Sequence, residues 1–439
     1  MSARNRELMG LVPVSLLITG GFTAVYIARQ NDLSSATLTY GGIFLALCLF
    51  VHLFIRRTLP DADPYLFPLV ALLAAFGLVI IYRIDQDLAR QQAGWFVAGI
   101  ALFITTVLLL RDVRTLERYR YLIAATGIGL LALPRLPGIG AQVNGAYLGV
   151  DLGPIAFQPT ELAKICIVIF LASYLIERGE VLVLGARRFM GMTLPPLKHL
   201  GPLLVVWGAA MLMLIFIRDL GSSLMFFGAF LALLYLATGR LFFVLAGLSL
   251  FVVGAWFFAG TVQHVGDRVD VWLDPWKDSG GSGYQIAQSL YAQADGGLFG
   301  RGFGESLLNN LDGSTIVPAP HTDLIYAVIT NEVGLFGAAA VLLVYLLFAE
   351  RGFKVATLAT DGFEKLLAAG LTAVFALQAF VIVGGVTRVI PLTGVTLPFV
   401  SYGGSSIVAN FILLALLLTI SQRARAAHRG PSTAVVPPA

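Results

Sequence analysis

The chain has 439 residues, of which 58% are hydrophobic and only 12% are charged, with a formal net charge of +4. Soluble domains carry about a quarter charged residues, so this chain has too few charges to cover a water-facing surface, and lipid is its expected main solvent. Its small positive charge does not indicate a nucleic-acid partner, because no dense basic block is present and membrane topology explains the charges better.

Twelve stretches are apolar and approach the roughly 20 residues that a helix needs to cross a bilayer. They are 9–28, 36–55, 64–82, 93–110, 120–135, 158–177, 201–217, 222–238, 241–260, 323–349, 365–387 and 405–421. The sequence therefore predicts an all-α, polytopic membrane helix bundle. Residues 1–63 are expected to add two helices to a ten-helix core at 64–421, and residues 422–439 to form a cytoplasmic tail.

One long interval, 261–322, is polar and precedes the tenth predicted span. With the N-terminus placed in the cytoplasm, most of the 29 lysines and arginines fall in segments on the inner side. This bias predicts a bacterial cytoplasmic-membrane protein with both termini inside. The interval 261–322 then forms a large extracellular loop.

The segment FQPTELAKI, residues 157–165, carries two charges at the start of a predicted span. Glu161 and Lys164 are three residues apart and therefore share one helix face. A helix start with an internal ion pair is the commoner explanation. The alternative is a charged pair that faces a cavity, with Lys164 available to a phosphate or a carboxylate.

The segment RDLGSS, residues 218–223, forms a compact polar turn that a capped hairpin explains equally well. Its arginine belongs to a larger set of outer cations from four separate segments. If these cations converge, they suit a diphosphate. The set is Lys164, Arg218, Arg268 and Arg388.

The segment HTDLIYA, residues 321–327, places a carboxylate where an apolar run begins. Thr322 or Asp323 could simply cap the new helix. Near the membrane surface, however, a carboxylate is partly desolvated, and its pKa can rise toward that of a general base. Further along, Glu332 lies inside the span, where we expect it to pair with a distant arginine or lysine.

The segment PLTGVTLPFVSYGGSS, residues 391–406, separates the last two predicted spans and is rich in proline, glycine and hydroxyl side chains. If backbone this irregular dips into a membrane, it must line a cavity or be buried in protein. Glycines here allow close approach of a ligand or of a neighbouring helix, and the second case is the commoner one.

Together with the run DRVDVWLDP…GSGYQIAQSLYAQADGGLFGRGFG, these motifs resemble, in order and spacing, those of the SEDS family (RodA, FtsW and SpoVE). The resemblance covers roughly residues 64–421. It implies an all-helical membrane enzyme, a peptidoglycan glycosyltransferase that polymerises lipid II into glycan strands at the outer membrane face. It also implies a class B penicillin-binding protein as partner and assistance by Mg²⁺ or Mn²⁺.

The essential aspartate of the family's H-T-D-F-I motif falls on Asp323, which the resemblance therefore identifies as the catalytic residue. The chain departs from the family in two places. Pro318-Ala319 stands where the family usually has Pro-Glu, and the segment 144–149 lacks the family's arginines and tryptophan. The first 63 residues look like an extension of actinobacterial RodA-type members, which favours elongation over division.

The expected substrate-binding residues lie in or next to these motifs, and no metal ligands are assigned. Two other functions remain open: a transporter that flips the lipid-linked precursor, and a scaffold that only recruits a transpeptidase. Charged residues in spans fit a transporter too. The expected substrate-binding residues are Glu161, Lys164, Arg218, Arg268, His321, Thr322, Arg388 and Ser401.

Overall fold

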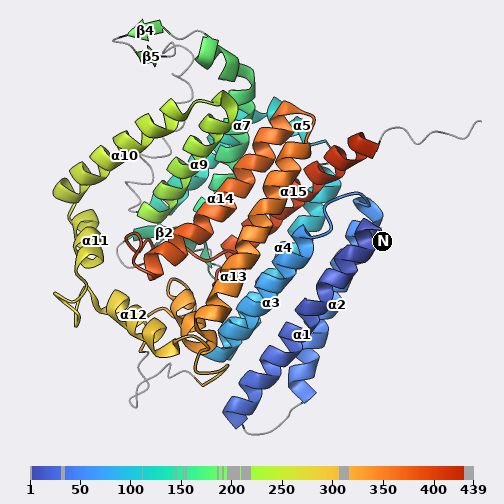
Figure 1. Ribbon diagram of the computed structural model, residues 1–439, viewed down its shortest axis with the longest axis vertical. Coiled ribbons are helices and arrows are strands. Elements are labelled where there is room, and N and C mark those ends of the chain that lie inside the picture. Colours follow the sequence, from blue (N-terminus) through green and yellow to red (C-terminus); the bar gives the residue numbers. More distant parts are fainter. Residues whose placement is uncertain are drawn as a thin grey trace, which may run out of the picture.

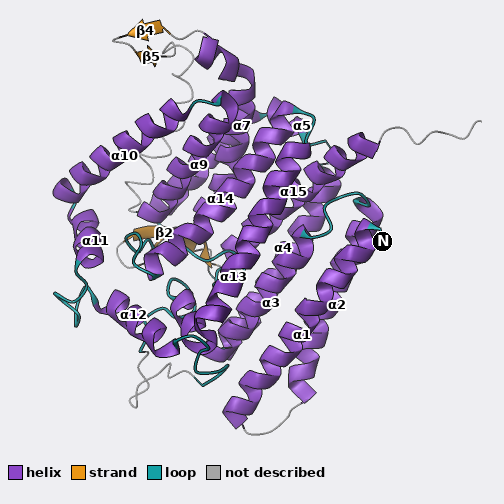
Figure 2. Cartoon of the chain, viewed as in Figure 1, coloured by secondary structure: helices purple, strands orange, loops and turns teal. Residues whose placement is uncertain are grey.

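The computed structural model describes residues 2–30, 35–110, 112–143, 146–151, 153, 156–184, 187–189, 192–194, 208, 219–305 and 316–429. Figures 1 and 2 show long helices that run side by side, with a few short strands at the ends of the bundle. Among the described residues, nine helices are long and apolar enough to cross a membrane. The chain is an all-α, multi-pass membrane protein.

The helices that correspond to predicted spans follow in chain order. They are α1 (Ala3–Gln30), α2 (Ser35–Thr58), α3 (Leu66–Ile84), α4 (Gln86–Leu109), α6 (Arg120–Ala132), α7 (Thr160–Leu184), α9 (Leu220–Thr238), α10 (Leu241–Thr261), α13 (Ile325–Leu358), α14 (Gly362–Val386) and α15 (Gly404–Arg429). The remaining helices are α5 (Arg114–Arg118), the 3₁₀ turn η1 (Leu133–Arg135), α11 (Gln263–Leu273) and α12 (Tyr284–Gly296). The last two lie within the polar interval.

The structure departs from one predicted span, leaves another untested and adds short strands. The stretch 120–135 forms only the 13-residue α6, which continues into η1. The stretch 201–217, apart from residue 208, and the neighbouring Arg218 lie outside the described residues, so this span stays a prediction. Short strands, which the sequence analysis did not predict, form an antiparallel sheet β1 (Gly140–Val143), β2 (Ala146–Asp151), β3 (Ala156–Phe157) and a hairpin β4 (Arg187–Phe189), β5 (Met192–Leu194).

The start of α1 and the end of α15 lie at the same end of the bundle (Figure 1). Arg4 in α1 donates to the Ala62 carbonyl, while the Asp63 carboxylate pairs with Arg425 in α15. The Asp63 amide also donates to the Ser421 hydroxyl at 2.9 Å. This end is opposite to α11 and α12, so the polar interval and the chain ends mark two different faces of the bundle.

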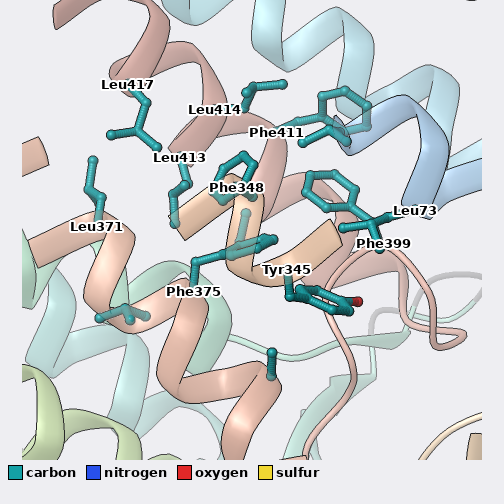
Figure 3. Close-up of a cluster of buried hydrophobic side chains, with 14 of the residues drawn as sticks. Leu73, Tyr345, Phe348, Leu371, Phe375, Phe399, Phe411, Leu413, Leu414 and Leu417 are labelled. Atoms are coloured by element: carbon teal, nitrogen blue, oxygen red, sulfur yellow. The ribbon is translucent and has the colours of Figure 1, made fainter. Parts of the chain in front are cut away.

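A cluster of buried aromatic side chains connects the long helices at the centre of the bundle (Figure 3). Phe348 of α13 and Phe375 of α14 have ring centroids 4.2 Å apart. Phe399, from the loop between α14 and α15, inserts beside them and contacts Phe411 of α15 edge-to-face at 5.3 Å. The Tyr345 hydroxyl donates to the Pro398 carbonyl at 2.6 Å. This core therefore anchors the irregular loop 391–403 as well as joining the helices.

Helix α13 is interrupted at Gly334, whose φ of 65° and ψ of −172° are not helical. The loop 297–304 fills the interruption. The amides of Arg301 and Gly302 donate to the carbonyls of residues 331 and 332. On the other side of the break, the Leu335 amide donates to the Gly297 carbonyl at 2.9 Å. Backbone groups released by the kink are thus satisfied by the loop, as burial requires.

Glycine is required where this loop meets the kink. A Cβ added at Gly300, which has a φ of 81°, would lie 2.1 Å from the Glu332 carbonyl oxygen. Gly297 also has a positive φ, 55°, but a Cβ there would meet nothing within 4 Å. The two positions share the backbone strain and differ in the steric clash.

We therefore predict that Gly300→Ala destabilises the protein more than Gly297→Ala. The Gly297 variant should cost about 1–3 kcal/mol, because a φ of 55° with a ψ of −141° strains any residue other than glycine. The Gly300 variant adds an overpacking cost of about 1–3 kcal/mol. Thermal unfolding in detergent, followed by tryptophan fluorescence, measures both. Equal losses of Tm would show that the loop does not dock in the kink.

Candidate active site

Asp323 lies in the turn that precedes α13, and its carboxylate is not a helix cap. The N-cap of α13 is Leu324, and no side chain caps the helix. Within the described part of the chain no hydrogen bond to the Asp323 carboxylate is found, although the residue is half-buried. The capping role that the sequence left open for Asp323 is therefore wrong, and its carboxylate oxygens are available to a ligand.

The environment of Asp323 raises its pKa to about 6. Burial among protein atoms is the main cause, because it disfavours the charged form. The charge of Arg268 lowers the pKa and the charge of Asp219 raises it. Gly394, in the loop after α14, faces the carboxylate: a Cβ added there would lie 3.7 Å from Oδ2. A group with this pKa takes up and releases protons near neutral pH.

Arg268 comes from α11 and reaches the same region. Its guanidinium donates to the Leu392 carbonyl at 3.1 Å and interacts electrostatically with both Asp219 and Asp323. Burial lowers the pKa of Arg268, and the two carboxylates oppose that shift. It forms no contact ion pair with either acid in the described structure, so its remaining donors are not used up by a carboxylate.

Asp219 is the residue that the sequence analysis missed, although it belongs to the RDLGSS motif. It is the N-cap of α9 and accepts from the Ser222 amide at 3.0 Å and the Ser222 hydroxyl at 2.5 Å. Burial raises its pKa despite these hydrogen bonds. Gly221, two residues on, would place a Cβ 2.2 Å from Val395, so this helix start packs directly on the loop 391–403.

Glu161 and Lys164 form an ion pair on α7, and each side chain is 3% exposed. Lys164 also donates to the Gln378 side chain of α14 at 2.6 Å, and Gln378 donates back to Glu161 at 3.3 Å and to the Thr396 carbonyl at 2.9 Å. No sequence motif pointed to Gln378. Through the Thr396 carbonyl, the network holds the loop 391–403. The negative charge of Glu161 also raises the pKa of Asp219.

Ser401 and Tyr402 hold the backbone next to Asp323. The Ser401 hydroxyl donates to the Thr322 carbonyl at 2.8 Å and accepts from the Leu397 amide at 2.9 Å. The Tyr402 amide donates to the His321 carbonyl at 2.8 Å. Because both contacts act on main-chain atoms, they fix the position of the turn that carries Asp323.

Two glutamines of α4 hold Ser401 and Tyr402, which form the clamp on the main chain of residues 321–322. Gln92 donates to the Ser401 carbonyl at 3.0 Å, and Gln91 accepts from the Tyr402 hydroxyl at 2.6 Å. The His321 ring contacts the Tyr402 ring edge-on with centroids 5.9 Å apart. Burial lowers the pKa of His321, which keeps its ring neutral at physiological pH.

Arg388 binds the C-terminal end of α11 rather than the region of Asp323. Its side chain donates to the carbonyls of Trp272, at 2.7 Å, and Leu273 at the end of α11, while the Trp272 indole donates to the Arg388 carbonyl. A cation at a helix C-terminus is favourable. The expected outer cations thus take up separate positions: Arg268 beside Asp323, Lys164 in a buried network, and Arg388 on α11, with Arg218 outside the described residues.

Glu332 pairs with Arg83 at the end of α3 at 3.2 Å, which confirms the distant partner expected for it. The Gly304 amide also donates to this carboxylate at 3.3 Å. Glu332 is therefore a structural residue that joins α3, α13 and the docked loop.

The described residues bring together no group of three histidine, cysteine, aspartate or glutamate side chains that would hold a metal ion. Mg²⁺ is, however, commonly bound through one or two carboxylates with the rest of its shell supplied by water and substrate phosphates. Asp219 and Asp323 would be suitable carboxylates. A cation here would depend on the ligand for most of its coordination.

We predict that Ser401→Ala loosens the turn at 319–324. The change removes both hydrogen bonds of the hydroxyl and leaves the Thr322 carbonyl and Leu397 amide without their partner, at a cost of about 1–3 kcal/mol. Hydrogen exchange of the turn should accelerate at least about fivefold. Ser249→Ala in α10, where the hydroxyl contacts only its own helix, is the control. Unchanged exchange at 319–324 would remove the positioning role of Ser401.

Comparison with known proteins places the chain in a family. The model of the FtsW, RodA and SpoVE cell cycle proteins matches residues 64–426. Peptidoglycan glycosyltransferase RodA of Mycobacterium tuberculosis (strain ATCC 25618 / H37Rv) is 41% identical over 433 residues, 96% of this chain and 91% of that protein. Stage V sporulation protein E of Bacillus subtilis (strain 168) is 31% identical over 383 residues, 84% of this chain and 99% of that protein.

Solved structures agree. A chain in a structure on the coordination of polymerization and crosslinking by a peptidoglycan synthase complex has a TM-score of 0.66 and 25% identity, and covers 82% of this chain and 97% of its own length. The rod shape determining protein RodA of Thermus thermophilus shares the fold, with a TM-score of 0.58, 23% identity, and coverage of 82% and 96%. The chain belongs to the FtsW, RodA and SpoVE family.

Proposed function

We infer that this chain is a peptidoglycan glycosyltransferase that polymerises lipid II into glycan strands at the outer face of the cytoplasmic membrane. One observation carries the inference: the half-buried Asp323 carboxylate accepts no hydrogen bond from the described residues and has a pKa of about 6. A general base must be free to accept a proton and must titrate near the working pH. The relatives named peptidoglycan glycosyltransferase support this reaction class.

In the proposed reaction, Asp323 accepts the proton of the 4-hydroxyl of the acceptor sugar. The oxygen attacks the anomeric carbon of the donor, and a new glycosidic bond forms as the bond to the lipid diphosphate breaks. The diphosphate leaves with the bonding electron pair. Arg268, the cation that interacts with Asp323, would stabilise the charge that develops on this leaving group.

The other expected substrate-binding residues divide into two roles in this proposal. His321 and Thr322 precede the base and would present their side chains to the sugar, while Ser401 holds the Thr322 carbonyl and the Tyr402 amide holds that of His321. Glu161 and Lys164 hold Gln378, which donates to the Thr396 carbonyl of the loop 391–403, and the charge of Glu161 acts on Asp219. Arg388 fixes α11, the helix that supplies Arg268. A bound Mg²⁺ or Mn²⁺ would add Lewis-acid stabilisation of the diphosphate.

The proposal extends to topology and to a partner. The excess of basic residues predicts that both chain ends are cytoplasmic and that the interval 261–322 faces outward. A class B penicillin-binding protein, which crosslinks glycan strands, is the proposed partner. The structural relative that belongs to a peptidoglycan synthase complex supports this choice.

We predict that Asp323→Asn reduces polymerisation of purified lipid II in detergent by on the order of 10²–10⁴-fold, the usual contribution of a general base. Asp267→Asn removes an exposed carboxylate from α11 and serves as the matched control. Elongated glycan strands are separated on gels. Wild-type protein that makes no strands would favour a flippase, because detergent leaves no membrane to cross, and an active Asp323→Asn variant would favour a scaffold.

The pH dependence should follow the titration of Asp323. The base acts only when it is deprotonated, so kcat/KM should rise with pH up to about 6 and level off above it. Polymerisation initial rates measured between about pH 4.5 and 8 test this, with the folded state monitored in parallel. An acid limb that persists unchanged in the residual activity of Asp323→Asn would belong to another group.

Two further variants should move this acid limb in opposite directions. Arg268→Gln removes the charge that lowers the pKa of Asp323, so the limb should shift to higher pH. Asp219→Asn removes the charge that raises it, so the limb should shift to lower pH, while the asparagine still caps α9. Shifts of the same sign would contradict the electrostatic assignment.

A further inference from the structure

An apolar cavity of about 410 Å³ lies between α1, α3 and α13, away from Asp323. Every residue that lines it is apolar, including Leu17 of α1, Leu72 of α3 and Val341 of α13. Its volume falls in the range of ligand-binding pockets, about 300–1,000 Å³. α1 precedes the part of the chain that the family model covers, so the cavity lies at the seam between the N-terminal helices and the core.

The cavity occupies one half of the bundle's thickness. Along α13 it extends from Val333 to Val344, about 16 Å at 1.5 Å per residue. The hydrocarbon core of a bilayer is about 30 Å thick, so this length is close to one leaflet. Phe303, from the loop that docks in the α13 kink, lines the cavity and contacts Phe76 of α3 at 6.2 Å between ring centroids. The half in question is therefore the one nearest the polar interval.

The chemistry of the walls selects the occupant. Water has no polar partner in such a cavity and would not fill it. A protein helix, about 10 Å across with its side chains, needs a much wider opening. Leu16 at the rim is 69% exposed, so the cavity borders the lipid that surrounds the bundle. A single hydrocarbon chain satisfies both the apolar walls and the depth of one leaflet.

We propose that this cavity binds one acyl chain of a membrane phospholipid, from the leaflet on the side of the interval 261–322. The depth of one leaflet favours an acyl chain over a polyprenyl chain, which is longer than a leaflet is deep. The bound chain fills the seam between α1 and α13 and supports Phe303 from below. Through that residue it stabilises the loop that pairs with α13.

Gly20 of α1 gives a direct test, because it lines the cavity and a Cβ added there would meet nothing within 4 Å. Gly20→Leu should therefore fill the space without a clash in the protein. Gly42→Leu in α2 adds the same side chain at an equally open, exposed position that does not line the cavity. The two variants match in size, in helix propensity and in exposure to lipid.

The experiment is native mass spectrometry of the full chain, delipidated in detergent and then incubated with phosphatidylglycerol or with undecaprenyl phosphate. Wild type and Gly42→Leu should retain one phosphatidylglycerol. In Gly20→Leu, the fraction of protein with a bound phosphatidylglycerol should be at least about tenfold lower. Gel filtration and Tm report folding, and Gly20→Ala provides a milder variant if the leucine does not fold. Equal retention by all variants, or retention of undecaprenyl phosphate alone, would overturn the proposal.

The binding test does not depend on the proposed catalytic function. A protein that retains phosphatidylglycerol but makes no glycan strands would leave the cavity assignment intact and contradict the polymerase. Strand synthesis with no retained phospholipid would do the reverse.

Discussion

The contact between the loop 391–403 and the turn at 321–322 is the constraint on which the site depends. Asp323 is held through its neighbours' main chain, by Ser401 and Tyr402, and has no side-chain anchor of its own among the described residues. The clamp is in turn fixed by the aromatic core, in which Phe399 packs against Phe411. The acid can therefore remain free for chemistry while its position is set by the packing of the whole bundle.

The charges around Asp323 do not cancel. Two carboxylates, those of Asp219 and Asp323, interact electrostatically with one arginine, Arg268, and burial disfavours the charged form of all three groups. Such an arrangement is costly for stability and typical of functional sites. A bound diphosphate would add negative charge and so stabilise the charged form of Arg268. If Arg268 formed a tight ion pair before the diphosphate bound, this cation would not be available to the ligand.

Much of this could be predicted from the sequence, because lipid imposes simple rules on length and polarity. Such rules predict nine of the spans, the location of Asp323 at the head of α13 and the pairing of Glu332 with a distant basic residue, although not which one. The rest depends on tertiary contacts. That Arg268 reaches Asp323 while Arg388 binds α11 is decided by how α11 packs, and Gln378 joins the buried network only because α7 and α14 are neighbours. The docking of 297–304 into α13 likewise has no local signal beyond its glycines.

The break at Gly334 divides α13 into a short part that follows Asp323 and a longer part. The loop 297–304 bonds to both parts. In the part that follows Asp323, the carbonyls of residues 331 and 332 accept from Arg301 and Gly302, and in the longer part the amides of Leu335 and Phe336 donate to the carbonyls of residues 297 and 298. The docked loop therefore supplies the bonds that the break removes and fixes the two parts of α13 relative to each other. A change on the lipid-facing surface of the longer part can therefore reach the turn that carries Asp323 through one docked loop rather than through an unbroken helix.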